Sequence, residues 1–302
     1  MKLKKIVIFG GSGFLGKYLC SELIKNKNYK IVNYDQKKFI LKSKNFNFIK
    51  GNILDKKKIN KVLKNSKIVI NLSGLSDIEE CRDNPLKSAK INILGNLNIL
   101  NSCVDNKVNK FLYASSLYSF SDQGSFYKCT KLASEVYIKE YNKIYGIKYI
   151  VLRYGSIYGE GSNDKNGINR IFNSIIKKKK IIYNGNKSAE RSYVHVEDVA
   201  KSTALIIKKN FDNSTIIIKG KKKFKIKDLL NSIKKLFHLK QRIQYGKNIM
   251  VAHYIKSPKN FEIPKIKNLY VKETKPFEKR LKKLMKYLTI RNKKINKITW
   301  IN

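Results

Sequence analysis

A glycine-rich stretch and an aspartate near the N-terminus have the spacing of a dinucleotide site. GGSGFLG at 10–16 follows a strand-like run and opens a helix-like one, so its backbone N–H groups can hold a pyrophosphate at the start of a helix. Asp35 closes the next strand-like run 19 residues after Gly16, where a carboxylate can accept hydrogen bonds from ribose hydroxyls. The alternative is a structural turn with a surface aspartate. The residues predicted to contact the cofactor here are Gly10, Gly13, Phe14, Leu15, Gly16 and Asp35.

The residues around Asp35 also indicate which dinucleotide binds. Lys37 and Lys38 are cations that could attract the 2′-phosphate of NADP. The Asp35 carboxylate would repel that phosphate, a like-charge contact that costs free energy in a partly buried site. We therefore predict NAD as the cofactor.

Tyr127 and Lys131 lie four residues apart, on one face of a predicted helix. An ammonium group at that spacing can lower the pKa of the phenol and prepare it as a general base. The pattern alone is weak, because 18 tyrosines in so lysine-rich a chain give about 3.5 such pairs by chance. Three are present: Tyr34 with Lys38, Tyr127 with Lys131, and Tyr183 with Lys187.

Position selects Tyr127 from these three tyrosines. It follows the strand-like run 110–115, whose carboxyl end carries the hydroxyl pair Ser115-Ser116. Ligands of parallel sheets bind beyond the carboxyl ends of the strands, so these hydroxyls and Tyr127 are predicted to meet at one site. The alternative for the two serines is turn capping.

Together these motifs resemble the extended short-chain dehydrogenase/reductases, specifically nucleotide-sugar epimerases of the UDP-glucose 4-epimerase type. The resemblance runs from about residue 4 to residue 210. GGSGFLG is similar to the family's glycine motif, GNILD at 51–55 to its adenine-contacting segment, and NLSG at 71–74 to a strand end beside the cofactor. The resemblance adds Asn52, Ile53, Leu72, Ser73 and Gly74 to the cofactor contacts, with Asn52 replacing the usual aspartate.

The resemblance also implies catalytic and substrate residues. Ser116, Tyr127 and Lys131 match the catalytic serine, tyrosine and lysine, and the lysine also holds the nicotinamide ribose. In LRYGSIYG at 152–159, Ser156 stands at a substrate-side position where asparagine is usual, and Ser116 also contacts substrate. Arg191, in RSYVHVEDVA, matches the arginine that contacts the substrate diphosphate. The alternative for Arg191 is a surface salt bridge to Glu190 or Glu197.

The implied activity is NAD-dependent epimerisation of a nucleotide-diphosphate sugar, through transient oxidation to a keto-sugar and return of the hydride to the other face. The 4,6-dehydratases of this family carry an Asp-Glu pair after the catalytic hydroxyl, and Leu117-Tyr118 follows Ser116 here. That difference argues against dehydration. Two alternatives stay open: a nucleotide-sugar dehydrogenase or reductase with net cofactor turnover, and a non-catalytic dinucleotide-binding scaffold.

The elements that must position these residues alternate along the first half of the chain. Strand-like runs at 5–9, 30–34, 46–50, 67–72, 110–115 and 148–153 are separated by helix-like stretches at 14–26, 55–65, 85–106 and 126–145. This order predicts an α/β fold with a doubly wound parallel sheet of the Rossmann type. Residues 1–154 plus about 191–210 are predicted to form the NAD-binding domain. About 155–190 plus 211–302 are predicted to form a smaller substrate domain, with the site in the cleft between them.

Charge is the unusual feature of the composition. The 302 residues carry a formal net charge of +45, which by itself suggests a nucleic-acid partner. The cations are 59 lysines and only 7 arginines, whereas recognition of bases and phosphates favours the guanidinium group. We therefore predict no nucleic-acid partner, and attribute much of the lysine excess to A/T-rich codons.

The remaining composition, 42% hydrophobic and 29% charged, is that of an ordinary globular protein. Cys20, Cys81, Cys103 and Cys129 show neither the spacing of a zinc site nor that of a disulfide framework, so no metal is predicted and the thiols are expected to be free. Apolar runs are too short to span a bilayer. We expect a cytoplasmic protein without a membrane partner, and a homodimer, the ordinary assembly for the family it resembles.

Overall fold

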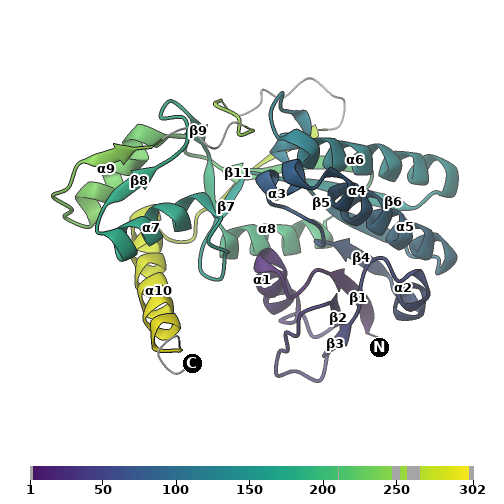
Figure 1. Cartoon of the computed structure of the whole chain (residues 1–302). Helices are drawn as coiled ribbons and strands as arrows, with labels where there is room; N and C mark the ends of the chain where they lie inside the picture. The colour runs from purple at the N-terminus through teal and green to yellow at the C-terminus, as the bar shows by residue number, and fades with distance from the viewer. Residues whose placement is uncertain (1–2, 210, 247–251, 257–265, 299–302) are drawn as a thin grey trace.

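An eight-stranded parallel sheet forms the centre of the larger part of the molecule, at the right in Figure 1. The computed structural model describes residues 3–209, 211–246, 252–256 and 266–298. The strand order is β14-β11-β6-β5-β4-β1-β2-β3. The bounds are β1 Lys4–Phe9, β2 Tyr29–Asp35, β3 Phe46–Lys50, β4 Ile68–Asn71, β5 Lys110–Ser116, β6 Lys148–Tyr154, β11 Ser214–Gly220 and β14 Ile266–Val271.

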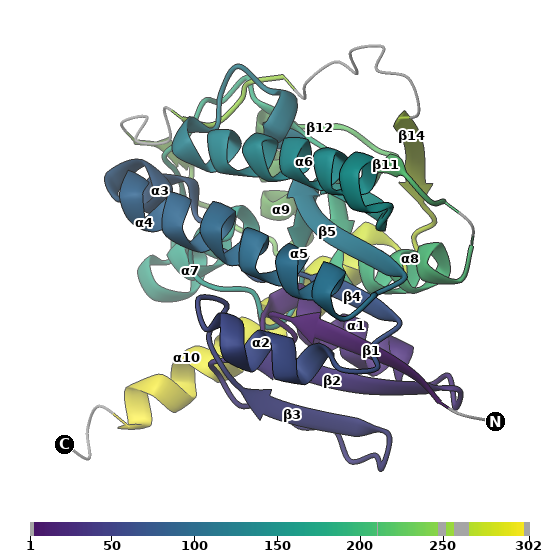
Figure 2. The same cartoon turned by 90° about the vertical axis from the view of Figure 1, so that its right-hand side faces the viewer.

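Alternation along the strands divides the core of this sheet into two layers. In β1, Ile6 and Ile8 point to one face, where helices α1 (Phe14–Leu23) and α8 (Val196–Lys208) cover them. Val7 and Phe9 point to the other face, under α2 (Lys56–Leu63), α5 (Gly95–Asp105) and α6 (Ser125–Tyr145), which Figure 2 shows in front of the strands. The predicted doubly wound α/β fold is confirmed.

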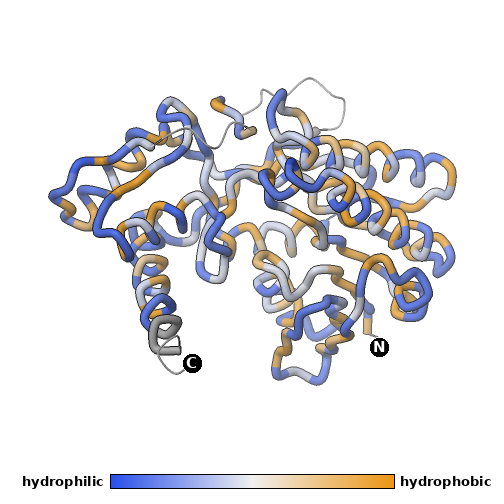
Figure 3. The backbone as a smooth tube through the Cα atoms, in the orientation of Figure 1, coloured by the Kyte–Doolittle hydropathy of each residue, from blue (hydrophilic) through white to orange (hydrophobic). Residues whose placement is uncertain are grey.

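A smaller part, at the left in Figure 1, has its own apolar core. Phe172, Leu230 and Leu284 are fully buried there, on three different helices. Its helices are α7 Gly167–Lys178, α9 Ile226–Leu236 and α10 Phe277–Ile298, and its strands pair as β7 (Ser156–Tyr158) with β10 (Tyr193–His195), β8 (Ile181–Tyr183) with β13 (Ile243–Tyr245), and β9 (Glu190–Arg191) with β12 (Phe224–Lys225). Helices α5, α6 and α10 alternate between hydrophobic and hydrophilic residues in Figure 3, as helices with one buried face do.

Two details differ from the sequence-based expectation. The helix expected over 85–106 is three segments, α4 (Pro85–Ala89), a π-helical turn at Lys90–Leu94, and α5, preceded by a short α3 (Ile78–Asp83). The division at residue 211 also differs from the observed sheet, because β11 and β14 extend the large sheet beside β6. Among the described helices, no stretch combines the length and apolarity that crossing a membrane requires.

A buried carboxylate joins three elements near the middle of the sheet. Glu135 on α6 accepts hydrogen bonds from the Ser115 hydroxyl on β5 and from Arg153 on β6, whose Nη2 lies 2.5 Å from Glu135 Oε2. The Glu135 and Arg153 side chains are 1% and 3% exposed. The Arg153 guanidinium also lies 3.7 Å from the centroid of the Phe120 ring. This cluster fixes α6 against β5 and β6.

We predict that Glu135→Gln lowers the free energy of unfolding by about 3 to 5 kcal/mol, because it leaves the Arg153 guanidinium buried without its counter-charge. Urea denaturation followed by circular dichroism measures the change. The control is Glu140→Gln on the same helix, where a half-exposed carboxylate lies 3.8 Å from Lys143, and its expected effect is within about 0.5 kcal/mol. Equal losses in the two variants would contradict the role given to Glu135.

Candidate active site

The glycine turn after β1 brings the backbone of α1 close to the sheet. Gly10 has φ of +80°, a conformation that side chains other than glycine rarely adopt. A Cβ on Gly16 would lie 2.3 Å from the Gly10 carbonyl oxygen, so only glycine allows this approach. Helix α1 starts after Gly13 without a capping side chain among the described residues and without an acidic residue in its first turn. Its first N–H groups suit the pyrophosphate of a dinucleotide.

Asp35 lies at the carboxyl end of β2, beside this turn. Its carboxylate accepts hydrogen bonds from the backbone N–H of Ser12 at 3.0 Å and of Lys37 at 2.9 Å. The Lys37 and Lys38 side chains are exposed. The carboxylate thus lies at the strand end where the ribose of a dinucleotide is expected, and it is tied directly to the glycine turn.

The predicted adenine segment meets α5 through a second close approach. A Cβ on Gly95 would lie 2.5 Å from Ile53 Cδ1, so the glycine that begins α5 makes room for Ile53. Asn52 uses its side-chain oxygen to accept the Leu54 N–H, and its backbone carbonyl accepts the Tyr34 hydroxyl at 3.0 Å. Tyr34, one of the two alternative tyrosines, therefore has a structural contact away from the hydroxyl pair.

The loop after β4 carries Leu72, Ser73 and Gly74 and is linked to α6 through one buried asparagine. Asn92 lies in the π-helical turn, accepts the Leu75 N–H at 2.7 Å, and donates to the Leu75 carbonyl and the Thr130 hydroxyl at 3.0 Å. Gly74 has φ of +149°, and a Cβ there would lie 2.8 Å from the Asn92 side-chain oxygen. Asn92 thereby fixes the loop beside Lys131.

Ser116, Tyr127 and Lys131 come together at the end of β5, as predicted from their spacing. Ser116 ends the strand, and Tyr127 and Lys131 lie on the buried face of α6. Lys131 Nζ donates to the Ala114 carbonyl oxygen at 2.8 Å and lies 5.8 Å from the centroid of the Tyr127 ring. The three groups thus lie within one small region of the sheet edge.

The titration of this pair differs from the sequence-based expectation. Burial raises the pKa of Tyr127 to about 12, while a hydrogen bond with Ser116 acts in the opposite direction. Burial also lowers the pKa of Lys131 to about 8. The expected lowering of the tyrosine pKa by Lys131 is therefore absent from this structure, because the ammonium is itself desolvated and directed toward the Ala114 carbonyl.

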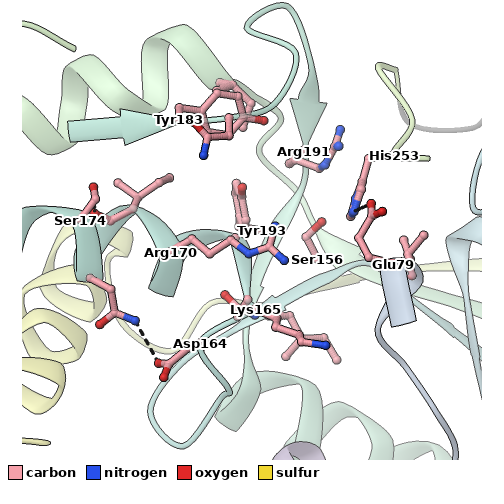
Figure 4. Close-up of a pocket in the computed structure, with 18 of the residues that line it drawn as sticks. Glu79, Ser156, Asp164, Lys165, Arg170, Ser174, Tyr183, Arg191, Tyr193 and His253 are labelled. Atoms are coloured by element: carbon pink, nitrogen blue, oxygen red, sulfur yellow. Dashed lines mark hydrogen bonds and ion pairs between the residues drawn. The ribbon is translucent and has the colours of Figure 1, made fainter. Parts of the chain in front are cut away.

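Next to these residues is a cavity of about 630 Å³ between the two parts of the molecule (Figure 4). Four of the predicted site residues line it: Ser116, Tyr127, Ser156 and Arg191. The lining residues without a predicted role include Glu79, Tyr118, Arg170, Tyr183 and His253. Tyr183, the other alternative tyrosine, reaches this cavity from β8, whereas Tyr127 reaches it from α6.

Arg191 is buried in this cavity wall rather than paired on the surface. Its guanidinium lies 4.2 Å from the centroid of the Tyr254 ring and donates to the Glu190 backbone carbonyl at 2.8 Å. Glu197 instead pairs with Arg280. The surface salt-bridge alternative for Arg191 is wrong, because the side chain turns inward to an aromatic face.

A chain of aromatic contacts connects Arg191 to Tyr127. Tyr254 packs on Tyr118 with ring centroids 4.6 Å apart, and Tyr118 packs on Tyr127 at 6.3 Å. The Tyr118 hydroxyl is hydrogen-bonded to His253 Nδ1 at 2.8 Å. Burial is the main reason that the pKa of His253 falls to about 4, so its imidazole is neutral at physiological pH. The segment containing His253 and Tyr254 therefore closes one side of the cavity.

A family model described as the NAD dependent epimerase/dehydratase family matches residues 6–218. The chain belongs to this family. Its cofactor is NAD, and the glycine turn, the uncapped start of α1 and Asp35 fit that dinucleotide. Within the described residues, no three His, Cys, Asp or Glu side chains gather as metal ligands would.

Similar proteins include both epimerases and dehydratases. A Methanocaldococcus jannaschii protein named "Putative UDP-glucose 4-epimerase" is 30% identical over 253 residues, 76% of this chain and 81% of that protein. A dTDP-D-glucose 4,6-dehydratase of Dictyostelium discoideum is 28% identical over 243 residues, 68% of this chain and 56% of that longer protein. The structure of a UDP-N-acetylglucosamine 4-epimerase from Methanobrevibacter ruminantium M1 has a TM-score of 0.84 at 22% identity and covers 96% of this chain and 100% of that one. These proteins support the fold and the family, but they do not distinguish epimerisation from dehydration.

We predict that the unaltered protein binds NAD more tightly than NADP. Asp35→Ala is expected to narrow the ratio of the two affinities by roughly tenfold or more, because it removes a like-charge contact with the 2′-phosphate while Lys37 and Lys38 remain. Calorimetric titration of both dinucleotides measures it. Asp35→Asn is the control for the hydrogen bond to Ser12, since it keeps an acceptor and loses the charge. Tighter binding of NADP by the unaltered protein would contradict the placement of Asp35.

Proposed function

We propose that the protein is an NAD-dependent epimerase that acts on a nucleotide-diphosphate sugar. The observation that carries the proposal is the shared cavity: Ser116 and Tyr127 line it together with Arg191. A sugar can then face the hydroxyls of the two catalytic residues while its diphosphate contacts the guanidinium group. The relatives named as nucleotide-sugar epimerases support the same assignment.

In the proposed mechanism, Tyr127 removes the proton from the reacting sugar hydroxyl, and Ser116 hydrogen-bonds the same oxygen. Because burial raises the pKa of Tyr127 to about 12, its phenolate form would need the positive charges of Lys131 and of the bound cofactor ring beside it. NAD, when bound, would supply the hydride acceptor and, in its reduced form, the hydride donor. Lys131 holds the nicotinamide ribose and maintains positive charge near the phenol. Arg191 keeps the diphosphate in place while the keto-sugar turns over to present its other face. Tyr127 finally returns the proton to the new alcohol.

The residues after Ser116 favour epimerisation over dehydration. Tyr118 occupies the position where the dehydratases carry an acidic residue, and its hydroxyl is already bonded to His253. This position therefore carries a phenol in place of a carboxyl group. No carboxylic acid is present here to protonate the leaving hydroxyl. Two acidic residues still line the cavity, but Glu79 pairs with Arg82, and Asp164 with Arg291.

We predict turnover of a nucleotide sugar to an isomer of equal mass, with no net change in NADH absorbance, because the hydride returns to the substrate. Incubation with substoichiometric NAD and a panel of nucleotide sugars, followed by chromatography and mass spectrometry, tests this. In the same assay, Tyr127→Phe is expected to lower the rate about 10² to 10⁴-fold with NAD affinity retained. Tyr34→Phe is the control and should retain the rate.

Other outcomes of that assay would assign other reactions. Stoichiometric formation or consumption of NADH would indicate a dehydrogenase or reductase. A product lighter by one water would indicate a dehydratase. Comparable rate losses in Tyr127→Phe and Tyr34→Phe would remove Tyr127 from the chemical step.

Arg191→Lys is expected to weaken nucleotide-sugar binding by roughly 1 to 3 kcal/mol, because an ammonium cannot reproduce the paired donors of a guanidinium or its stacking on Tyr254. Calorimetric titration of UDP into the two proteins measures the loss. NAD affinity and melting temperature are expected to change little. Equal affinity for UDP in the two proteins would remove Arg191 from the substrate site.

The homodimer stays a prediction, and α6 offers a surface for it. Phe126, Tyr137 and Ile144 are 46%, 45% and 67% exposed and lie along one stripe of this helix, beside its buried face. An apolar stripe on a helix can pair with its own copy about a two-fold axis. We propose this stripe as the contact between two copies of the chain.

A further inference from the structure

Five of the seven arginines of this chain have specific contacts, and one of the other two, Arg170, lies inside the cavity. Four of the seven pair with carboxylates: Arg82 with Glu79, Arg153 with Glu135, Arg280 with Glu197, and Arg291 with Asp164. Arg191 stacks on Tyr254, and Arg242 lies exposed on the surface. Within the described part of the chain, the Arg170 side chain has neither a hydrogen bond nor an ion pair, although it lines the cavity.

The position of Arg170 directs its charge toward substrate. It lies in the first turn of α7, where its backbone N–H bonds to the Asn166 carbonyl at 2.9 Å, so the start of its side chain is fixed. Figure 4 shows the side chain extending from α7 into the middle of the cavity, between Lys165 and Arg191. Arg170 and Arg191 line the same cavity, and both contribute to the lowered pKa of His253, so both guanidinium groups lie within electrostatic reach of that imidazole.

Charges on the cavity wall are not balanced around these two arginines. The lining carboxylates are Glu79 and Asp164, and both are paired with arginines outside the lining set. Three lysines also line the cavity: Lys165 is 3.2 Å from Asp77 and is paired with it, and Lys177 and Lys178 lie in the last turn of α7, at the other end of that helix from Arg170. Two guanidinium groups without carboxylate partners repel each other across the cavity, and an anion between them removes that repulsion.

We propose that Arg170 is a second oxyanion-binding residue of the substrate site and acts opposite Arg191. Its ligand is an anionic oxygen group of the nucleotide sugar, either the diphosphate or a carboxylate on the sugar. This inference rests on the proposed nucleotide-sugar function and adds to it a residue that determines which substrates bind. A guanidinium fits either group because its N–H donors can form two parallel hydrogen bonds.

The experiment is calorimetric titration of UDP, UDP-glucose and UDP-glucuronate into the NAD-loaded unaltered protein, Arg170→Gln and Arg170→Lys. Arg170→Gln is expected to lower affinity roughly tenfold to a hundredfold, and Arg170→Lys by less, because charge remains. Arg242→Gln is the control, since it removes the same charge from the exposed surface. Melting temperature and NAD affinity are expected to stay constant in all variants.

The three ligands distinguish the two sources of the anion. A similar loss for all three assigns Arg170 to the diphosphate, and a loss confined to UDP-glucuronate assigns it to the sugar carboxylate. Unchanged affinity for all three, or an equal loss in Arg242→Gln, would overturn the inference. Binding is measured without turnover, so a loss in Arg170→Gln supports it even if the protein does not epimerise. If the unaltered protein is an active epimerase and Arg170→Gln binds the three ligands with unchanged affinity, only the role of Arg170 is wrong. If the unaltered protein binds none of the three ligands, both the proposed function and the role of Arg170 are wrong.

Discussion

The Glu135 carboxylate is the contact on which the geometry of the catalytic residues depends. It accepts hydrogen bonds from Ser115 and Arg153, so one buried anion ties α6 to two neighbouring strands. Lys131 and Tyr127 lie about one and two helical turns before it on the same helix, and Ser116 directly follows Ser115. A shift of α6 along the sheet would therefore separate the catalytic hydroxyls and also break this ion pair, whose loss is costly in a dry interior.

The parallel sheet explains why residues far apart in sequence share one edge. All strand neighbours in the large sheet run in the same direction, so the glycine turn, Asp35, the Gly74 loop and Ser116 all follow carboxyl ends. Close approach at this edge is possible only where side chains are missing. Gly16 brings α1 to the β1 turn, and Gly95 brings α5 to Ile53. These contacts place a dinucleotide-sized surface beside the cavity that holds Tyr127.

Local patterns allowed most of the large sheet and its site residues to be predicted from sequence. A glycine turn, a strand-end aspartate and an i, i+4 pair each depend on neighbouring residues, and the structure brings them to one edge. Tyr118, Arg170 and His253 could not be found this way, because they meet only when α7 and the segment 252–256 fold over β5. The membership of β11 and β14 in the large sheet was missed for the same reason: β11 pairs with β6, as Ser214 does with Ile150, and β14 pairs with β11, as Ile266 does with Thr215, so each pairing joins segments far apart in sequence.

The lysine excess and the arginines of the cavity act at different ranges. A net charge of +45 creates a positive potential around the whole molecule, which speeds the approach of anionic ligands and weakens as salt is added. That potential has no directional preference and cannot orient a substrate. Arg191, held on the Tyr254 ring, offers hydrogen-bond donors in a fixed direction in a wall that excludes most water. Under the proposed function, attraction of the substrate would therefore follow from overall composition, whereas its orientation beside Tyr127 would follow from the few arginines whose positions the fold determines.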